Sequence, residues 1–266
     1  MNRDRGPRAG RRRGPDSAAG YTRPVTTRPT PVSRGRFITF EGPEGSGKTS
    51  KAEALRARLA AVGAPVRLTR EPGGTPTGEA SRAILLRHDG VAGAPDPRTD
   101  ALLFNAARAQ LIAQVVGPAL DRGEIVLCAR FADSTLAYQG YGAGLALDDL
   151  RDLERFATGG RRPDLTILLD LPAEVGLARK SGDEVTRFEA GLDIDFHRRV
   201  RAGFLALAAA EPERFAVVDA TLTFEAVFAT IVATVSHRLP DLAAVLGRPS
   251  PVGEDEPAPT ALRIPR

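Results

Sequence analysis

The segment Gly42 to Thr49, GPEGSGKT, holds the residues whose types and spacing point most directly to chemistry. It matches G-x-x-x-x-G-K-[ST], a pattern in which glycines let successive backbone N–H groups converge on a phosphate. Lys48 is expected to reach the outer phosphates of a nucleotide, and the Thr49 hydroxyl to ligate Mg²⁺. The predicted phosphate-binding residues are Gly42, Pro43, Glu44, Gly45, Ser46, Gly47, Lys48, Thr49 and Ser50.

The flanking segments fit a phosphate-binding turn between a strand and a helix. Residues 36–41 show the apolar alternation of a buried strand, and residues 50–62 have the Ala, Leu and Arg content of a helix. A helix N-terminus directly after the loop adds partial positive charge that favours an anion.

Residues 36–239 alternate predicted strands and helices. We expect further strands at 65–69, 124–129, 165–170 and 215–219, and helices at 78–87, 148–157, 173–180, 192–210 and 224–238. A long helix capped by Thr99 should end before Gly123. This order predicts an α/β fold, a three-layer domain with a five-stranded, mostly parallel sheet.

The two ends of the chain differ in composition from the domain. Residues 1–35 are rich in Arg, Pro and Gly and residues 240–266 in Pro, so both are predicted to be disordered tails. Residues 1–36 carry a net charge of +8, which leaves −4 on the other 230 residues because the whole chain carries +4. The basic tail is more typical of a solvated extension or an upstream start-codon assignment than of specific nucleic-acid binding, which we do not expect.

The single cysteine, Cys128, lies in the apolar run 125–129, so no internal disulfide can form and a buried apolar role is expected. No run approaches the roughly 18 apolar residues that span a bilayer, and the N-terminus lacks a secretory hydrophobic region. We therefore expect a soluble protein of the reducing cytoplasm.

Ligands of such sheets bind beside the carboxyl ends of the strands, and arginines follow two of the predicted strands there. Arg70 and Arg130 are suited to phosphate, although pairing of Arg70 with Glu71 or another local acid is an alternative. Phe104 and Arg108 lie four residues apart on one helix face. They can present a ring and a guanidinium to a nucleobase, although a phenylalanine at this spacing more often belongs to the core.

Six segments occur in the order and spacing of bacterial thymidylate kinases, namely GPEGSGKT, TREPGGT, LLFNAARAQ, RFADSTLAYQG, RRPDLTILLDLP and FHRRVRAGFLALA. The chain resembles that family over residues 36–239, and TREPGGT and AYQG are more specific to it than the phosphate loop. The resemblance implies a P-loop nucleoside monophosphate kinase fold, phosphoryl transfer from ATP to dTMP, Mg²⁺ as cofactor, and a homodimer packed through helices.

The resemblance also implies roles for individual residues. Lys48 and the loop amides hold the ATP phosphates, Thr49 the Mg²⁺, and Glu44 the sugar 3′-hydroxyl and metal-bound water. On the acceptor side, Arg70 and Arg130 hold the dTMP phosphate, Phe104 stacks on thymine, Arg108 bonds its O4 edge, Ser134, Thr135 and Gln139 line the base and phosphate side, and Tyr138 excludes a ribose hydroxyl. Phosphoryl transfer depends on positioning and charge neutralisation, so no Cys or His nucleophile is required.

In this family a catalytic arginine comes from the phosphate loop or from a lid. Residues 43–46 contain no arginine, so we expect it in a lid at about residues 179–190. Arg187 is the first candidate, and Arg179, the second, is also expected to contact ATP. Charged lid residues are equally typical of a solvated surface.

Two carboxylates typical of the family are missing. Ala129 stands where an Asp usually precedes the arginine, and Thr186 replaces the Asp of D-R-x-E. Asp170 or Glu44 is expected to order metal-bound water instead. Because charged groups at a reacting phosphate contribute strongly to the rate, two alternatives stay open, a catalytically impaired nucleotide-binding homologue and a kinase for a modified pyrimidine deoxynucleoside monophosphate.

Overall fold

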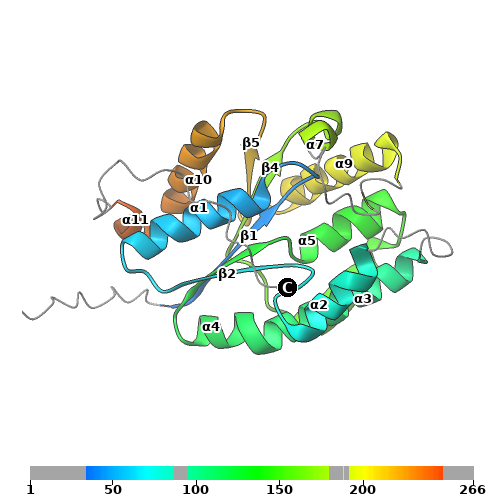
Figure 1. Ribbon diagram of the computed structural model, residues 1–266, viewed down its shortest axis with the longest axis horizontal. Coiled ribbons are helices and arrows are strands. Elements are labelled where there is room, and N and C mark those ends of the chain that lie inside the picture. The colour runs from blue at the N-terminus through cyan, green and yellow to red at the C-terminus, as the bar shows by residue number, and fades with distance from the viewer. Residues whose placement is uncertain (1–33, 87–94, 180–187, 189–191, 248–266) are drawn as a thin grey trace, which may run out of the picture.

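The computed structural model describes residues 34–86, 95–179, 188 and 192–247 of the chain (Figure 1). Strands and helices alternate along these residues, as the sequence predicts. None of the helices in these ranges has the length and apolar character needed to cross a membrane.

The five strands form one parallel sheet in the order β2-β3-β1-β4-β5. Their bounds are Arg36–Glu41 (β1), Val66–Arg70 (β2), Ile125–Ala129 (β3), Leu165–Asp170 (β4) and Phe215–Asp219 (β5). The predicted five-stranded parallel sheet is thereby confirmed. Because β1 is central and β3 is its neighbour, the segments that follow these two strands leave the sheet at the same edge.

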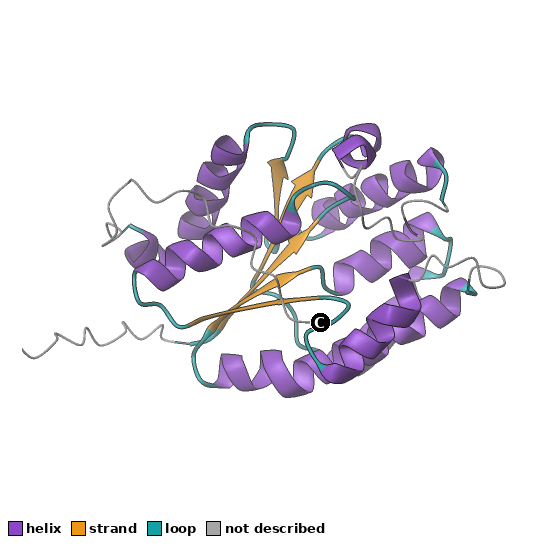
Figure 2. Ribbon diagram, viewed as in Figure 1, coloured by secondary structure: helices purple, strands orange, loops and turns teal. Residues whose placement is uncertain are grey.

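Helices cover both faces of the sheet (Figures 1 and 2). On one face, α1 (Lys48–Ala61), α10 (Phe224–Arg238) and α11 (Pro240–Leu246) share a hydrophobic cluster with Ile38 and Phe40. On the other face, α3 (Pro97–Leu111) and α4 (Gly117–Asp121) pack around Phe37, and α9 (Ile194–Ala210) covers β4 and β5. Successive β1 side chains point to opposite faces, so this one strand anchors both layers.

The remaining helical segments are α2 (Pro76–Leu86), α5 (Ala132–Thr135), a π-helical segment (Leu136–Gly142), α6 (Leu147–Thr158) and α7 (Ala173–Arg179). The helical conformation of residues 132–142 was not predicted, because the segment contains Gly140, Gly142, Asp133 and Thr135, whose residue types have low helix propensity. It turns the residues after β3 back over the edge of the sheet.

The long helix differs from its prediction at both ends. Asp96 caps it instead of Thr99, since the Asp96 carboxylate accepts a hydrogen bond from the Arg98 N–H at 2.8 Å and Pro97 occupies the first turn. Towards its end the helix widens into a π-helical segment, Ile112–Val116, before α4. Pro118 lacks an N–H group, so the regular α-helical ladder is interrupted there.

The domain extends beyond the predicted boundary at residue 239. Residues 240–246 form α11, whose Leu242, Val245 and Leu246 are buried, so their assignment to a disordered tail was wrong. Asp241 pairs with Arg36 at 2.7 Å and ties this helix to the start of β1. The Pro-rich composition hid a short apolar helix that begins at a proline. Of the two predicted tails, residues 1–33 and 248–266 lie outside the described residues.

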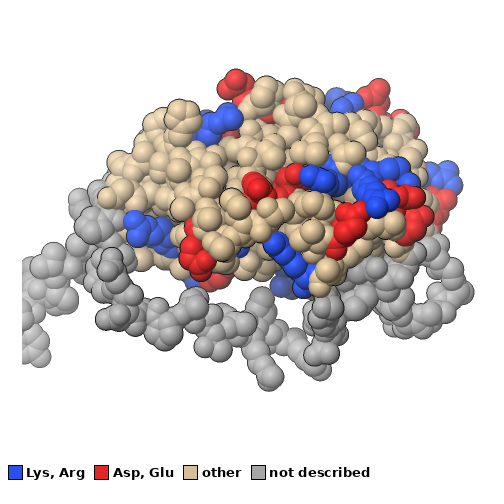
Figure 3. All heavy atoms as spheres, turned by 90° about the horizontal axis from the view of Figure 1, so that it is seen from above, with Lys and Arg blue, Asp and Glu red and all other residues tan. Residues whose placement is uncertain are grey.

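Charges on the surface are interleaved on the face that Figure 3 shows. There, acidic and basic side chains lie next to one another instead of gathering into regions of one sign. Many of the charged side chains are paired, as in the contacts of Arg198 with Glu174 at 2.7 Å and with Asp195 at 2.9 Å. This face offers no basic stripe of the kind that tracks a nucleic-acid backbone.

Candidate active site

The phosphate loop connects β1 to α1, and its glycines occupy conformations that other residues avoid. Gly45 and Gly47 have φ values of 67° and 81°, in the left-handed region. A Cβ atom on Gly45 would collide with the carbonyl group of Gly176 in α7. The loop is therefore held in shape by its own torsions and by close contact with α7.

Lys48 begins α1 and its side chain folds back into the loop. Its ammonium donates hydrogen bonds to the carbonyl oxygens of Gly42 at 3.0 Å and Pro43 at 2.7 Å, and to the hydroxyl of Ser46 at 3.0 Å. The amine is thus buried and held at the rim of the loop, where a phosphate oxygen can replace these acceptors.

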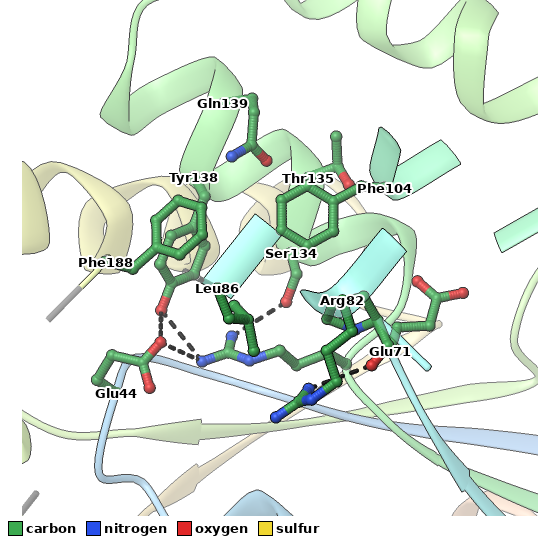
Figure 4. Close-up of a pocket in the computed structure, with 12 residues that line it drawn as sticks. Glu44, Glu71, Arg82, Leu86, Phe104, Ser134, Thr135, Tyr138, Gln139 and Phe188 are labelled. Atoms are coloured by element: carbon green, nitrogen blue, oxygen red, sulfur yellow. Dashed lines mark hydrogen bonds and ion pairs between the residues drawn. The ribbon is translucent and has the colours of Figure 1, made fainter. Parts of the chain in front are cut away.

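Arg130, directly after β3, reaches across the sheet edge to the phosphate loop. Its guanidinium lies 2.6 Å from the Glu44 carboxylate and 3.2 Å from the Ser134 hydroxyl. The Tyr138 hydroxyl donates a hydrogen bond to Glu44 at 2.8 Å (Figure 4). Arg130 has a φ of 66°, rare for a residue with a side chain, so its position is fixed by these contacts at a backbone cost.

Burial and charge tune this cluster. Burial opposes the charge of Arg130, but Glu44 and Tyr138 outweigh it and raise the pKa of Arg130 above its ordinary value. Burial, together with Glu44, raises the pKa of Tyr138 well above its usual range, despite the opposing effect of Arg130. The guanidinium therefore stays charged and the phenol stays protonated as a donor.

Glu41, the last residue of β1, positions the segment that follows β3. It accepts hydrogen bonds from the Phe131 N–H at 2.7 Å and from the Ser134 hydroxyl at 2.6 Å. Burial, aided by the charge of Asp133, raises the pKa of Glu41 to about 7. This role was not predicted, because the partners of Glu41 lie about 90 residues away in the sequence.

A cavity lies next to the Glu44–Arg130 pair and opens to solvent on one side; together with the solvent at its mouth it encloses about 590 Å³. Its wall is formed by Glu44, Glu71, Pro72, Arg82, Leu86, Phe104, Arg130, Ser134, Thr135, Tyr138, Gln139 and Phe188. Figure 4 shows the Phe104 and Phe188 rings at two sides of this cavity, and their centroids are 6.1 Å apart. The predicted acceptor residues Phe104, Ser134, Thr135, Tyr138 and Gln139 are therefore brought together.

Arg108 lies behind the cavity wall and is only 1% exposed. Its guanidinium pairs with Glu71 at 2.7 Å and donates to the Thr135 hydroxyl at 3.0 Å and to the Asn105 side-chain oxygen at 2.9 Å. Burial, opposed by Arg108, raises the pKa of Glu71 to about 7. The structure thus places Arg108 under the wall, where it orients Glu71 and Thr135.

Two buried oxygen atoms of the wall have no hydrogen-bond partner within the described residues. They are Oε1 of Glu71 and Oε1 of Gln139. Buried acceptors are ordinarily satisfied, so their environment fits a ligand that carries N–H groups. The ring of Phe104 in the same wall adds a stacking surface.

Arg70, at the end of β2, pairs with Glu79 at 3.4 Å and not with Glu71. Glu79 also accepts a hydrogen bond from the Gly74 N–H at 2.9 Å, which fixes the turn after β2. Nε of Arg70 is buried and has no hydrogen-bond partner among the described residues. The long pair with Glu79 leaves the guanidinium able to bind an added anion.

Asp170 is engaged by another residue. Both of its oxygens accept hydrogen bonds from Arg201, at 2.8 and 2.9 Å, which argues against its predicted role in ordering metal-bound water. Thr49 is exposed at the start of α1. No cluster of three or more His, Cys, Asp or Glu suited to a metal ion occurs among the residues that the structure describes. The residues present fit an ion held mainly by phosphate oxygens, with Thr49 as the protein ligand.

The predicted lid is described only at its edges. Arg179 ends α7 and donates hydrogen bonds to the carbonyl oxygens of Ala220 at 2.8 Å and Thr221 at 3.3 Å. Arg187 and Thr186 lie outside the described residues. Phe188 contributes to the cavity wall and was not predicted, although an aromatic residue within a charged segment was a usable signal.

Comparisons with known proteins agree on one family. The family model described as Thymidylate kinase matches residues 40–231. The chain is 53% identical over 203 residues to the thymidylate kinase of Thermomicrobium roseum, covering 76% of this chain and 94% of that protein. It is 51% identical over 208 residues to the thymidylate kinase of Deinococcus radiodurans, covering 78% and 99%.

A solved structure has the same fold. The crystal structure of thymidylate kinase from Ehrlichia chaffeensis superimposes with a TM-score of 0.61 at 33% sequence identity, covering 76% of this chain and 99% of that chain.

Proposed function

The chain belongs to the thymidylate kinase family, and we propose on that premise how its residues divide the work of transferring a phosphoryl group from ATP to dTMP, giving dTDP and ADP. The ATP phosphates bind at the loop 42–50, and dTMP binds in the cavity lined by Phe104 and Tyr138. The observation that carries this assignment is the ion pair of Glu44 with Arg130 at 2.6 Å, which joins the loop to the cavity wall.

The acceptor phosphate lies against Arg130 and Arg70. Arg130 stays charged beside the loop. Arg70 ends β2, next to β3, and is in register with Ala129, the residue before Arg130, so both arginines lie at the same edge of the sheet. Two guanidinium groups offset the repulsion between the acceptor phosphate and the terminal phosphate of ATP. Lys48 neutralises charge on the donor side, so that the attacking oxygen and the transferred phosphorus come together.

The nucleoside of dTMP contacts the rest of the cavity. Phe104 stacks on thymine, and the base N–H meets the buried oxygens of Glu71 and Gln139 that lack protein partners. Glu44 accepts a hydrogen bond from the sugar 3′-hydroxyl, and the Tyr138 ring packs where a ribose would carry its 2′-hydroxyl. A ribose 2′-hydroxyl packed against this ring would lose its hydrogen bonds to water and gain none from the ring, which disfavours the binding of ribonucleotides.

Mg²⁺ is held by Thr49 and the ATP phosphates. When bound, it neutralises charge on the phosphate oxygens. Arg187 remains our proposed catalytic arginine, because the loop supplies none, and Arg179 is proposed to contact ATP. Glu44 is proposed to orient water at this end of the site.

We propose a homodimer that forms through the helices α2, α3 and α6. Phe156 on α6 is 88% exposed and Leu102 on α3 is 58% exposed, and these helices pack on one another. Large exposed apolar side chains on adjoining helices are typical of an interface between subunits. Phe156→Asp should then convert a dimer to a monomer in sedimentation velocity, whereas a monomeric parent protein contradicts the proposal. The buried thiol of Cys128 is consistent with our proposal of a cytoplasmic location.

A second candidate function is nucleotide binding with impaired catalysis, which Ala129 favours. The side chains of Asp170 and Glu44, the expected substitutes, are both engaged by arginines. Turnover that depends on Lys48 contradicts this candidate.

Equilibrium binding tests the division of the site. By titration calorimetry, we expect Arg130→Met to weaken dTMP binding about tenfold or more and to leave ATP binding within about twofold. Lys48→Ala should have the opposite pattern. Loss of both ligands in Arg130→Met, with the fold intact by circular dichroism, contradicts separate donor and acceptor sites.

A further inference from the structure

Lys51 is a buried lysine on α1 that the assigned roles do not use. It is 7% exposed, and its ammonium lies 3.7 Å above the centroid of the Phe224 ring. Within the described residues this ammonium donates no hydrogen bond and forms no ion pair. The stem of Lys51 is packed away, whereas its ammonium still reaches solvent, where a bound anion can contact it.

The ammonium of Lys51 lies beside the phosphate loop. A Cβ atom placed on Gly47, the residue before α1, would be 3.7 Å from Nζ of Lys51. Gly47 is the last glycine of the loop, and the first N–H groups of the 14-residue helix α1 follow it. Lys51 therefore adds a full positive charge next to backbone groups that already favour an anion.

Other charges around Lys51 reinforce this tendency. Burial, followed by repulsion from Arg179, lowers the pKa of Lys51, and Glu225 only partly opposes this. Two cations thus act on each other beside a helix N-terminus, and among the described residues Glu225 is the acidic group that offsets part of their repulsion. A bound polyphosphate would remove this imbalance.

The position of Lys51 indicates which phosphates it meets. Lys48 folds towards Gly42 and Pro43 at the start of the loop, on the side of Arg130 and the acceptor cavity. Lys51 lies at the other end of the loop, against Phe224 and within the influence of Arg179. Its ammonium therefore faces the part of the donor away from the acceptor.

We propose that Lys51 is a further cation of the donor site, which binds the phosphates of ATP that are not transferred while the Phe224 ring holds its ammonium in place. This inference rests on the proposed binding of ATP at the loop. Because ADP keeps the same phosphates, Lys51 contributes to the binding of ATP and ADP alike. If Lys51 served only to stabilise the fold, replacing it would lower the thermal unfolding midpoint of the unliganded protein and leave the affinities for ATP and ADP unchanged.

The experiment compares Lys51→Gln with Arg56→Gln in the full chain. Arg56 lies on the same helix and pairs with Glu53. Its replacement by Gln removes one positive charge, as Lys51→Gln does, but away from the loop. Calorimetric titration with ATP, ADP and dTMP gives the dissociation constants, and thermal unfolding gives the midpoint with and without ADP. Lys51→Met, which keeps the apolar stem, serves as a second variant should Lys51→Gln fold poorly.

We expect Lys51→Gln to weaken ATP and ADP binding about tenfold each and to leave dTMP binding within about twofold. The unliganded midpoint should be equal to or above that of the parent, and the increase caused by ADP should shrink. Arg56→Gln should match the parent. An unchanged affinity for ATP and ADP in both Lys51 variants overturns the proposed role of Lys51, whether or not the unliganded midpoint falls. A parent protein that fails to bind ATP overturns the proposed donor site itself, which distinguishes the two failures.

Discussion

Glu44 of the phosphate loop and Arg130 after β3 form an ion pair at 2.6 Å, although 86 residues separate them in the sequence. Tyr138 donates a hydrogen bond to the same carboxylate oxygen, and Arg130 donates one to the Tyr138 hydroxyl at 3.2 Å. The three side chains thus form a closed set of contacts between the donor loop and the acceptor cavity. The relative position of the two substrates depends on this set.

Glu44→Gln should lower kcat for dTMP phosphorylation about tenfold or more. The amide keeps the shape of the side chain but leaves the half-buried guanidinium of Arg130 without its anion, so the cluster loses its geometry. Steady-state kinetics with saturating ATP measures the change. Glu213→Gln, at a fully exposed carboxylate, is the matched control and should match the parent. A Glu44→Gln variant with parental kcat would show that the cluster does not position the substrates.

Ala129→Asp should raise kcat about tenfold or more. Ala129 ends β3 in register with Phe40 on one side and Arg70 on the other, so an aspartate there enters the site between the two proposed phosphate-binding arginines. Ala129→Asn is the control, since it adds the volume without the charge. Equal rates for the Asp variant and the parent mean that another residue performs this role.

Arg108→Met should lower the free energy of unfolding by about 3–5 kcal/mol, because it leaves the buried Glu71 without its charged partner. Adding Glu71→Gln should recover part of that loss, since the uncompensated charge is then gone. Urea unfolding of the two single variants and the double variant forms a complete cycle. Strictly additive losses contradict a coupled Arg108–Glu71 pair.

Glu41 should make the parent less stable as pH rises from 4.5 to about 7. Its pKa is about 7 in the folded protein against an ordinary 4.5, so its protonated form is favoured by folding and that contribution is lost as pH rises through the folded pKa. The amide side chain introduced by Glu41→Gln does not titrate. The free energy of unfolding of this variant should therefore rise relative to that of the parent by about 1 kcal/mol or more between about pH 5 and about pH 8. Urea unfolding of both proteins across this range measures the gain, and a constant difference contradicts it.

The sequence predicted what depends on local pattern. All five strands have the apolar runs of buried strands, and the loop that contains Lys48 was recognisable from spacing alone. The prediction from sequence was wrong at α11, where a proline-rich composition concealed three buried apolar residues. It was also wrong at the start of α3, where Asp96 caps the helix in place of the predicted Thr99. Local composition cannot show which of two capping residues the tertiary structure uses.

The site required contacts that spacing cannot reveal. Phe104 and Arg108 were predicted to share a helix face and serve the base together, yet Glu71 holds Arg108 behind the wall while Phe104 lines the cavity. The burial of Lys51 against Phe224 likewise joins residues more than 170 positions apart. Such pairs follow from the fold, and only the fold gives their order in space.

The most direct test of the account is an ADP-release assay with Mg²⁺ and ATP and a panel of dTMP, dUMP, dCMP and UMP, with Lys48→Ala as the blank. We expect turnover that requires Lys48 and prefers dTMP, with UMP the poorest because of Tyr138. Binding of dTMP without turnover, or equal use of dUMP and UMP, would contradict the account.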